Sequence, residues 1–143
     1  MNFKPSKSLI KQLGNVQNMD TFSRKSDLDW PKEITTYLLE KYSITPSIDD
    51  SIIGGKMTVP VIQHEDSIDA DMSVVWFPKV NGSIVFVHGE NCRQAVVKDG
   101  SLVIFDHRLP HSVSANANRG ASKTGVWYYM AQGFNKVDEQ WKS

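Results

Sequence analysis

Two histidines and one aspartate lie at the ends of strand-like segments, at spacings that would suit a metal ion. His64 and Asp66 form a His-x-Asp pair in "IQHEDS", and residues two apart at the end of an extended strand project to the same side. His111 follows a later apolar run, in "LPHSV". Two imidazoles and one carboxylate on one face of a metal leave the opposite positions open, a set that suits non-haem Fe(II) and oxygen chemistry. A His-x-Asp pair is common by chance, so this prediction depends on His111 and on the basic residues that follow it.

Four other polar residues near these segments are assigned structural roles. His107 and Arg108 precede His111 in the same turn, and we expect them at the surface or behind the metal ligands. His88 ends the run "SIVFVH"; it is predicted to be a core or rim histidine, although that position also allows it to line a barrel. Glu65 lies between His64 and Asp66 and should point away from the metal.

Short runs rich in Val, Ile and aromatic residues predict the elements that would position these side chains. They read "KMTVPVIQ", "MSVVWF", "SIVFVH", "RQAVV", "SLVIF" and "TGVWYYMA". The dipeptides "NG" at 81–82 and "DG" at 99–100 are typical of hairpin turns. Six to eight strands at this spacing predict an antiparallel barrel or sandwich of the jelly-roll kind.

The first fifty residues have a different, helical pattern. In "DWPKEITTYLLEKYS", Asp29 is a predicted cap, Pro31 fits the first turn, and apolar residues follow at helical spacing. A second short helix is expected near 5–13. We therefore expect one domain over 1–143. In this division a segment of helices and loops (1–50) packs on a jelly-roll core (51–132), and 133–143 form a tail.

The composition is that of a globular domain rather than a disordered chain, with 143 residues, 40% hydrophobic and 22% charged. Sixteen basic residues balance sixteen acidic ones, so no overall field attracts nucleic acid or an anionic membrane. Cys92 is the single cysteine, which excludes an internal disulfide and a thiolate metal cluster. No apolar run approaches a membrane span or the core of a secretory signal. We therefore expect a cytoplasmic protein.

Three segments together resemble the Fe(II)- and 2-oxoglutarate-dependent dioxygenases, and within them the prolyl-4-hydroxylase-like branch. They are "QHEDS", "DGSLVIFDHRLPHSV" and "RGASKTGVWYY", within roughly residues 56–130. The resemblance implies a double-stranded β-helix, a mainly β, cupin-like barrel with one or two N-terminal helices, whose mouth holds the iron. It implies that His64, Asp66 and His111 are the iron ligands.

The resemblance also implies a basic residue that binds the distal carboxylate of 2-oxoglutarate, on the strand after His111. Arg119 and Lys123 both flank the expected position, which is Ala121. A guanidinium suits this role because its planar fork matches a carboxylate. Arg119 is preferred because alignment on "TG" brings it within one residue of the family position, and Lys123 remains open. Trp127 has the same strand parity and would line the cofactor pocket.

A tyrosine that often contacts the co-substrate in this family has no counterpart here, so that contact is unassigned. Of Trp76 and Phe77, one should face the pocket.

The function that the resemblance implies is hydroxylation of a C–H bond, with 2-oxoglutarate and O2 consumed. The short loops suggest an exposed substrate such as a peptide or protein. Two alternatives stay open: a cupin-type metal-binding isomerase or sugar-binding protein, and a non-catalytic jelly-roll interaction module. The early cupin motif has two histidines, whereas "QHEDSIDADM" has one. The substrate and the oligomeric state are left unassigned.

Overall fold

Two β-sheets form the body of the molecule in a computed structural model, which describes residues 3–14, 17–18, 28–50, 52–57, 61–64, 70–81, 84–88, 93–115 and 126–137. The larger sheet has the strand order β1-β3-β11-β5-β9, with β2 and β6 also paired to β11, and the smaller has the order β4-β10-β7-β8. Every pairing is antiparallel except that of β1 with β3.

The strands of the larger sheet are β1 (Gln17–Asn18), β2 (Ile44–Pro46), β3 (Ile53–Met57), β5 (Met72–Phe77), β6 (Val80–Asn81), β9 (Ser101–Asp106) and β11 (Val126–Lys136). Those of the smaller sheet are β4 (Val61–His64), β7 (Ile84–His88), β8 (Arg93–Val97) and β10 (His111–Ala115). Along the chain, β3, β4 and β5, and then β8, β9, β10 and β11, alternate between the sheets. This alternation is the double-stranded β-helix, or jelly roll, so the predicted fold class is confirmed.

The side-chain alternation of β5 divides the core into two layers. Trp76 belongs to a cluster between the larger sheet and the helices, whereas Phe77 belongs to a second cluster with residues of both sheets. Both are fully buried, at 0% and 1% exposure. Successive strand residues face opposite sides of a sheet, so Phe77 faces the barrel interior and Trp76 faces away from it.

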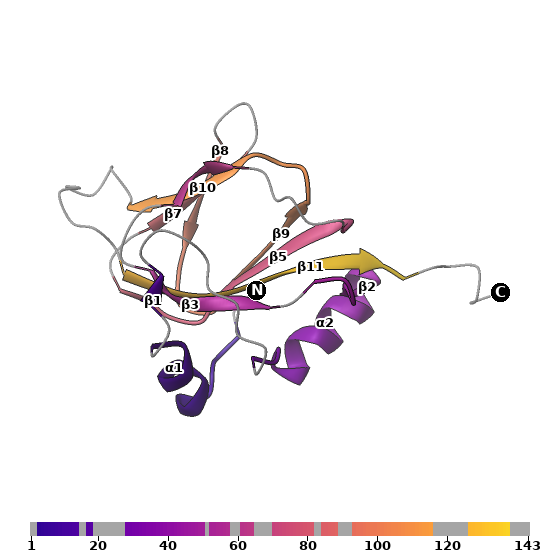
Figure 1. The fold of residues 1–143 in the computed structure, drawn as a ribbon, viewed down its shortest axis with the longest axis horizontal. Helices are drawn as coiled ribbons and strands as arrows, with labels where there is room; N and C mark the ends of the chain where they lie inside the picture. Colours follow the sequence, from indigo (N-terminus) through magenta and orange to yellow (C-terminus); the bar gives the residue numbers. More distant parts are fainter. Residues whose placement is uncertain are drawn as a thin grey trace.

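Helices α1 (Lys7–Gly14) and α2 (Lys32–Tyr42) cover the outer face of the larger sheet (Figure 1). Ile34 and Leu38 of α2 are completely buried there, in agreement with the predicted apolar face. The predicted cap was wrong: α2 begins after Pro31, whose carbonyl accepts the Ile34 N–H at 3.0 Å, and no side chain caps it. Asp29 lies too far before the first turn to reach these donors. Neither described helix has the length and apolarity needed to cross a bilayer.

Strand β11 is longer than the sequence suggested. It continues to Lys136, past the expected end of the core at 132, because its last residues pair with β2. Phe134 is completely buried, and its ring meets that of Trp30 edge-on at 5.7 Å. The first fifty residues also contribute two short strands, β1 and β2, to the larger sheet. Residues 138–143 of the expected tail lie outside the described residues.

Neither predicted hairpin dipeptide closes a hairpin. "NG" begins at the last residue of β6 in the larger sheet and precedes β7 of the smaller one, and "DG" connects β8 of the smaller sheet to β9 of the larger. Turn residues predict only the local backbone conformation. In a jelly roll, a turn of the same conformation can connect strands of different sheets. The run "KMTVPVIQ", expected as one strand, likewise divides into β3 and β4 of different sheets.

Gly100 fixes the turn between β8 and β9. Its φ of 79° is in the left-handed region, and a Cβ there would lie 2.6 Å from the Phe3 carbonyl oxygen. The Gly100 carbonyl accepts hydrogen bonds from the Phe3 N–H at 2.9 Å and the Trp76 indole at 3.2 Å. The turn therefore ties the start of the described chain to the larger sheet.

Gly100→Ala is expected to lower the free energy of unfolding by about 2–3 kcal/mol, because it combines backbone strain with a steric clash. Urea denaturation followed by circular dichroism measures the change. Lys98→Ala, at an exposed position in the same turn, should change stability by no more than about 0.5 kcal/mol. Equal stability of the two variants would contradict the close contact with Phe3.

Candidate functional site

All four histidines of the chain come to one end of the barrel, which we call the histidine end. Strand β4 ends at His64 and β7 ends at His88, while β10 begins at His111. His107 follows β9 directly, in the turn that leads to His111. Antiparallel strands that end and begin at the same level place these residues together, although they are far apart in the sequence.

Three of the histidines occupy one register row of the smaller sheet. The Cα of His111 is paired with that of His64 on β4 and with that of His88 on β7. Residues directly opposite one another on antiparallel strands share a sheet face. The β4 register slips by one residue just beyond the pair, between His111 and Val113. Bulges of this kind are frequent beside active sites, where they re-aim a side chain.

The row continues to β8, where Arg93 is the register partner of His88. This row is on the inner face of the smaller sheet. Val113 has the same strand parity as His111, and Val97 has the same strand parity as Arg93. Both valines are buried in the cluster between the sheets. On the outer face of β8, Val96 is 57% exposed. The inner face of the smaller sheet thus carries the row His64, His111, His88 and Arg93 at its histidine end.

The side chain of His111 is held in a defined tautomer. The residue is 5% exposed, and its Nδ1 lies 2.9 Å from the carbonyl oxygen of Leu109. A carbonyl can only accept, so Nδ1 is the donor, and in the neutral ring the lone pair is then on Nε2. The ring also packs at 4.6 Å from that of Phe105. A backbone carbonyl on one ring nitrogen is the usual support for a histidine whose other nitrogen binds a metal.

The turn that supplies the Leu109 carbonyl is itself closed by hydrogen bonds. Asp106 accepts the Arg108 N–H on its carboxylate at 2.9 Å and the Leu109 N–H on its carbonyl at 2.9 Å. The Arg108 side chain is exposed, which agrees with the surface position expected for it. These bonds fix Leu109 and, through it, the ring of His111.

His107 lies in the predicted turn but not at the surface. The residue is 7% exposed, and its ring Nδ1 lies 3.4 Å from the Ser73 hydroxyl oxygen. Its backbone N–H donates to the backbone carbonyl of Asp71 at 3.4 Å. The surface role expected for it is therefore wrong, because β5 covers the turn. The second expected role, behind the metal ligands, agrees with this burial.

The proposed ligand set is only partly within the described structure. Asp66 lies outside the described residues, and for His64 the structure describes the backbone alone. In the described ranges, no three His, Cys, Asp or Glu side chains gather closely enough to hold a metal ion. The pairing with His64 and the tautomer of His111 nevertheless fit a metal bound between them. The ligand set of His64, Asp66 and His111 stays a prediction.

The predicted co-substrate residues Arg119 and Lys123 also lie outside the described residues. Ala115 and Val126, which flank them, are at the barrel end opposite the histidine end: β10 runs away from His111, and β11 runs back toward it (Figure 1). Ala115 is about 13 Å along the strand from His111 at the usual rise per residue.

Trp127 was predicted to line the cofactor pocket. It has the parity of Tyr129, which packs between the sheets, so its position is on the inner face. Of the two β5 aromatics, Phe77 is the one on that face. The barrel interior between the two ends is therefore aromatic and apolar.

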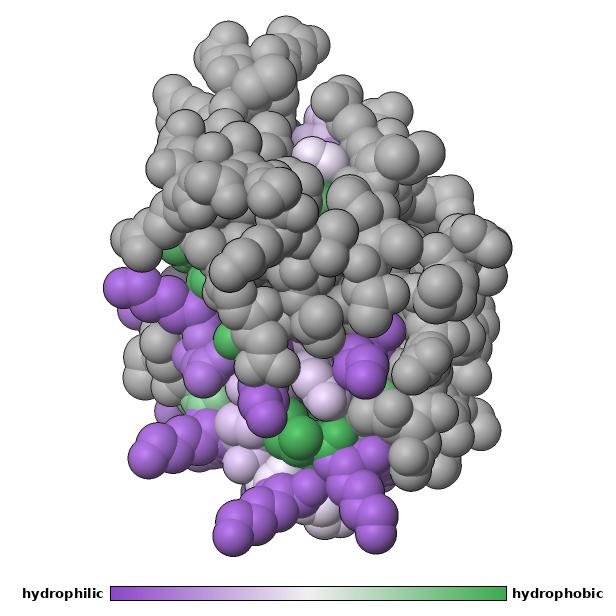
Figure 2. All heavy atoms as spheres, turned by 90° about the vertical axis from the view of Figure 1, so that its left-hand side faces the viewer, coloured by the Kyte–Doolittle hydropathy of each residue, from purple (hydrophilic) through white to green (hydrophobic). Residues whose placement is uncertain are grey.

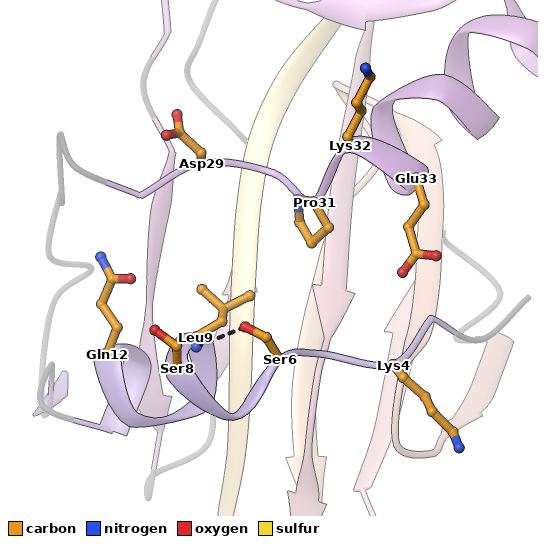
Figure 3. Close-up of a pocket in the computed structure, with 9 residues that line it drawn as sticks. All are labelled: Lys4, Ser6, Ser8, Leu9, Gln12, Asp29, Pro31, Lys32 and Glu33. Carbon is orange, nitrogen blue, oxygen red and sulfur yellow. Dashed lines mark hydrogen bonds between the residues drawn. The ribbon is translucent and has the colours of Figure 1, made fainter.

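A pocket of about 500 Å³ lies away from the histidines, between α1 and the segment that enters α2 (Figure 3). It is lined by Lys4, Ser6, Ser8, Leu9, Gln12, Asp29, Pro31, Lys32 and Glu33. Figure 3 shows its charged side chains pointing in different directions rather than toward one centre. On the face seen in Figure 2, hydrophilic side chains surround a small hydrophobic group among the coloured residues.

Sequence reasoning missed the row beyond His111. His88 was assigned to the core or the rim, and Arg93 was not considered. The available signal was the short connection between "SIVFVH" and "RQAVV", which makes His88 and Arg93 the closing pair of a hairpin. What the spacing did not show is that β10 pairs with the other side of β7.

No family model matches the sequence, and no curated protein matches it. Solved structures with a similar fold include a cupin-like protein from Thermotoga maritima (8% identity, TM-score 0.45), with 59% of this chain and 57% of that chain covered. Another is a cupin-2 domain protein from Shewanella frigidimarina, with 13% identity and a TM-score of 0.43. That match covers 64% of this chain and 80% of the Shewanella protein.

Hydroxypropylphosphonic acid epoxidase from S. wedmorenis, solved in complex with fosfomycin (18%, TM-score 0.44), covers 60% of this chain and 44% of its own. The chain thus spans about half the length of the Thermotoga protein and of the epoxidase. Likeness at these identities concerns the fold and not the chemistry.

Proposed function

We propose that the protein is an Fe(II)- and 2-oxoglutarate-dependent oxygenase that hydroxylates a C–H bond. One observation carries the proposal: His111 pairs with His64 on the inner face of the barrel, with its Nδ1 proton on the Leu109 carbonyl. In this proposal His64, Asp66 and His111 would hold the iron, a ligand set that suits non-haem Fe(II) and oxygen chemistry.

The protein's part begins with orientation of the His111 ring. The Leu109 carbonyl keeps Nδ1 protonated and directs Nε2 toward the metal, and Phe105 limits rotation of the ring. Partners of this kind commonly change metal affinity by about 10- to 100-fold. Asp66 would supply the negative charge that a divalent ion needs beside two neutral imidazoles.

The interior cluster would keep water from the reaction. Phe105 is buried and packs on the ring of His111, and Phe77 and Tyr129 are buried in the same cluster further along the barrel interior. Charges interact more strongly where water is excluded. Iron and 2-oxoglutarate, when bound, supply with O2 the oxidation that turns a C–H bond into an alcohol, while 2-oxoglutarate is converted to succinate and CO2. The distal carboxylate of 2-oxoglutarate needs a cation, for which the sequence offers Arg119 and Lys123.

The substrate class we propose is a peptide or protein side chain. Its basis is the shortness of the loops between Asp66 and His111, which suggests an open site rather than one that encloses a small molecule. A cupin-type isomerase or sugar-binding protein has the same barrel and is the main alternative. The single histidine of the early motif, where a cupin has two, favours the oxygenase.

The proposal is tested by adding Fe(II) and 2-oxoglutarate to the protein without oxygen. Chelation of the metal by the 2-oxo acid should produce a weak visible charge-transfer band, and admission of O2 should produce succinate. Fe(II) with succinate in place of 2-oxoglutarate is the control and should give no band. A metal-loaded protein without the band and without succinate would leave the cupin-type or non-catalytic alternatives.

A further inference from the structure

Strand β9 forms an unprotected edge of the larger sheet. It is the last strand of that sheet, beyond β5, and among the described strands it pairs with β5 alone (Figure 1). Its sequence, "SLVIFD", has neither a proline nor a lysine, and its register with β5 is regular from Ser101 to Asp106. Proteins usually blunt an exposed edge with a lysine, a proline, a bulge or a very short strand. An edge without these devices is suited to pairing with another strand.

The other described strands at sheet edges do have such devices. Strand β1 has two residues, the pairing of β4 with β10 has a register shift, and β8 begins with an arginine. Strand β9 is also the longest of these four, with six residues. This difference makes β9 the edge that is best suited to binding a partner strand.

The hydrogen bonds of β9 show which of its backbone groups face the free edge. The His107 N–H donates to the Asp71 carbonyl in register with the β5–β9 ladder, so the odd-numbered residues of β9 direct their backbone groups at β5. These groups alternate along an antiparallel strand, and those of Leu102 and Ile104 therefore point away from β5. Within the described part of the chain no strand lies on that side of β9. Two N–H and two C=O groups are thus open along the edge.

Intramolecular hydrogen bonds limit this open edge at both ends. The Gly100 carbonyl accepts the Phe3 N–H at 2.9 Å, and the Asp106 carbonyl accepts the Leu109 N–H at 2.9 Å. The backbone available for a partner is therefore a short stretch centred on Val103.

We propose that the protein forms a dimer in which β9 pairs with β9 of a second copy in antiparallel orientation. A twofold axis through Val103, perpendicular to the sheet, places Leu102 of each copy opposite Ile104 of the other. Residues in such a pair exchange both N–H···O bonds, so the two pairs use every open group of both copies. The contact is isologous and closes on itself. This inference does not depend on the proposed function.

The side chains at this edge fit the same arrangement. Leu102 and Ile104 are half-buried and pack on the cluster between the larger sheet and the helices. Residues opposite one another on antiparallel strands share a face of the sheet. In the dimer, Leu102 of one copy would therefore cover Ile104 of the other, and the two apolar layers would become continuous.

The charges at the two ends of β9 are also complementary. One end has the exposed Lys98 and Asp99, and the other has the exposed Asp106 and Arg108. Antiparallel pairing brings the first end of each copy next to the second end of the other. An acid and a base of one copy thus meet an acid and a base of the other, a pattern that favours association.

The dimer is tested by analytical ultracentrifugation of the full chain and of two variants at the same position. Leu102→Pro removes an edge N–H without removing a bond to β5, and proline is tolerated at edge positions of this kind. Leu102→Ala removes the side chain and keeps the N–H, so it is the matched control. Because two hydrogen bonds are lost per dimer, we expect a dissociation constant about 10- to 100-fold higher for Leu102→Pro than for Leu102→Ala. Circular dichroism establishes that both variants are folded.

Amide hydrogen exchange of the wild-type chain provides a second measurement that needs no variant. The N–H groups of Leu102 and Ile104 should become protected as the protein concentration rises and the dimer forms. The N–H of Val103, which faces β5, should be protected at every concentration. This comparison decides the question alone where Leu102→Pro does not fold.

Two results would overturn the proposal. One is a wild-type chain that sediments as a monomer at every concentration, with exchange at Leu102 and Ile104 unchanged by concentration. The other is a dimer that the two Leu102 variants form equally well and that leaves these two amides unprotected, because its interface would then be a different surface.

Discussion

Replacing His111 with alanine is expected to abolish metal binding and, with it, the visible band formed with 2-oxoglutarate. The substitution removes a buried imidazole whose Nε2 has the lone pair and whose Nδ1 is anchored on Leu109. We expect Co(II) affinity to fall by at least about 100-fold, beyond the loss typical of a residue that only supports a ligand. Spectroscopic Co(II) titration measures it.

His107→Ala is the matched control for this prediction. Its imidazole is as buried as that of His111, but it contacts Ser73. We expect a modest loss of thermal stability and little change in Co(II) affinity. If His107→Ala destroys metal binding and His111→Ala does not, the ligand assignment is wrong.

Replacing Phe134 with alanine is expected to lower the free energy of unfolding by about 3–5 kcal/mol, the cost of removing a fully buried aromatic ring. Phe134 has no exposed surface and joins the layer between the larger sheet and the helices, where it meets Trp30. Guanidinium denaturation of the metal-free protein measures the change.

Ile48→Ala, at a side chain that is 96% exposed, is the control and should change stability by no more than about 0.5 kcal/mol. A loss below about 1 kcal/mol for Phe134→Ala would mean that the helices do not pack on the end of β11, as expected if the barrel core ended at residue 132.

The elements that could be predicted are those whose local pattern of apolar residues matches their burial. Val, Ile and aromatic runs marked seven of the strands, and the apolar stripe of α2 marked its buried face. Strand β10 was missed as an element, because Val113 is the one large apolar residue in "HSVSA". The polar residues between and before it read as a loop, whereas in the fold His111 and Val113 face inward.

The parts of the site that were missed depend on pairings between distant strands. The burial of His107 arises from Asp71 and Ser73, which no local pattern connects to the turn. The place of His88 beside His111 is a matter of register between β7 and β10. Spacing along the chain predicts which residues point the same way on one strand, but it does not predict which strands become neighbours.

The pairing of β11 has a consequence for how the protein folds. This strand binds β2, β3, β5 and β6, and it follows all of them in the chain. Most contacts of the larger sheet are thus between residues far apart in sequence, and such topologies fold slowly. During synthesis, β3 and β5 would wait with unpaired edges until β11 emerges from the ribosome, a period in which a chaperone is most useful.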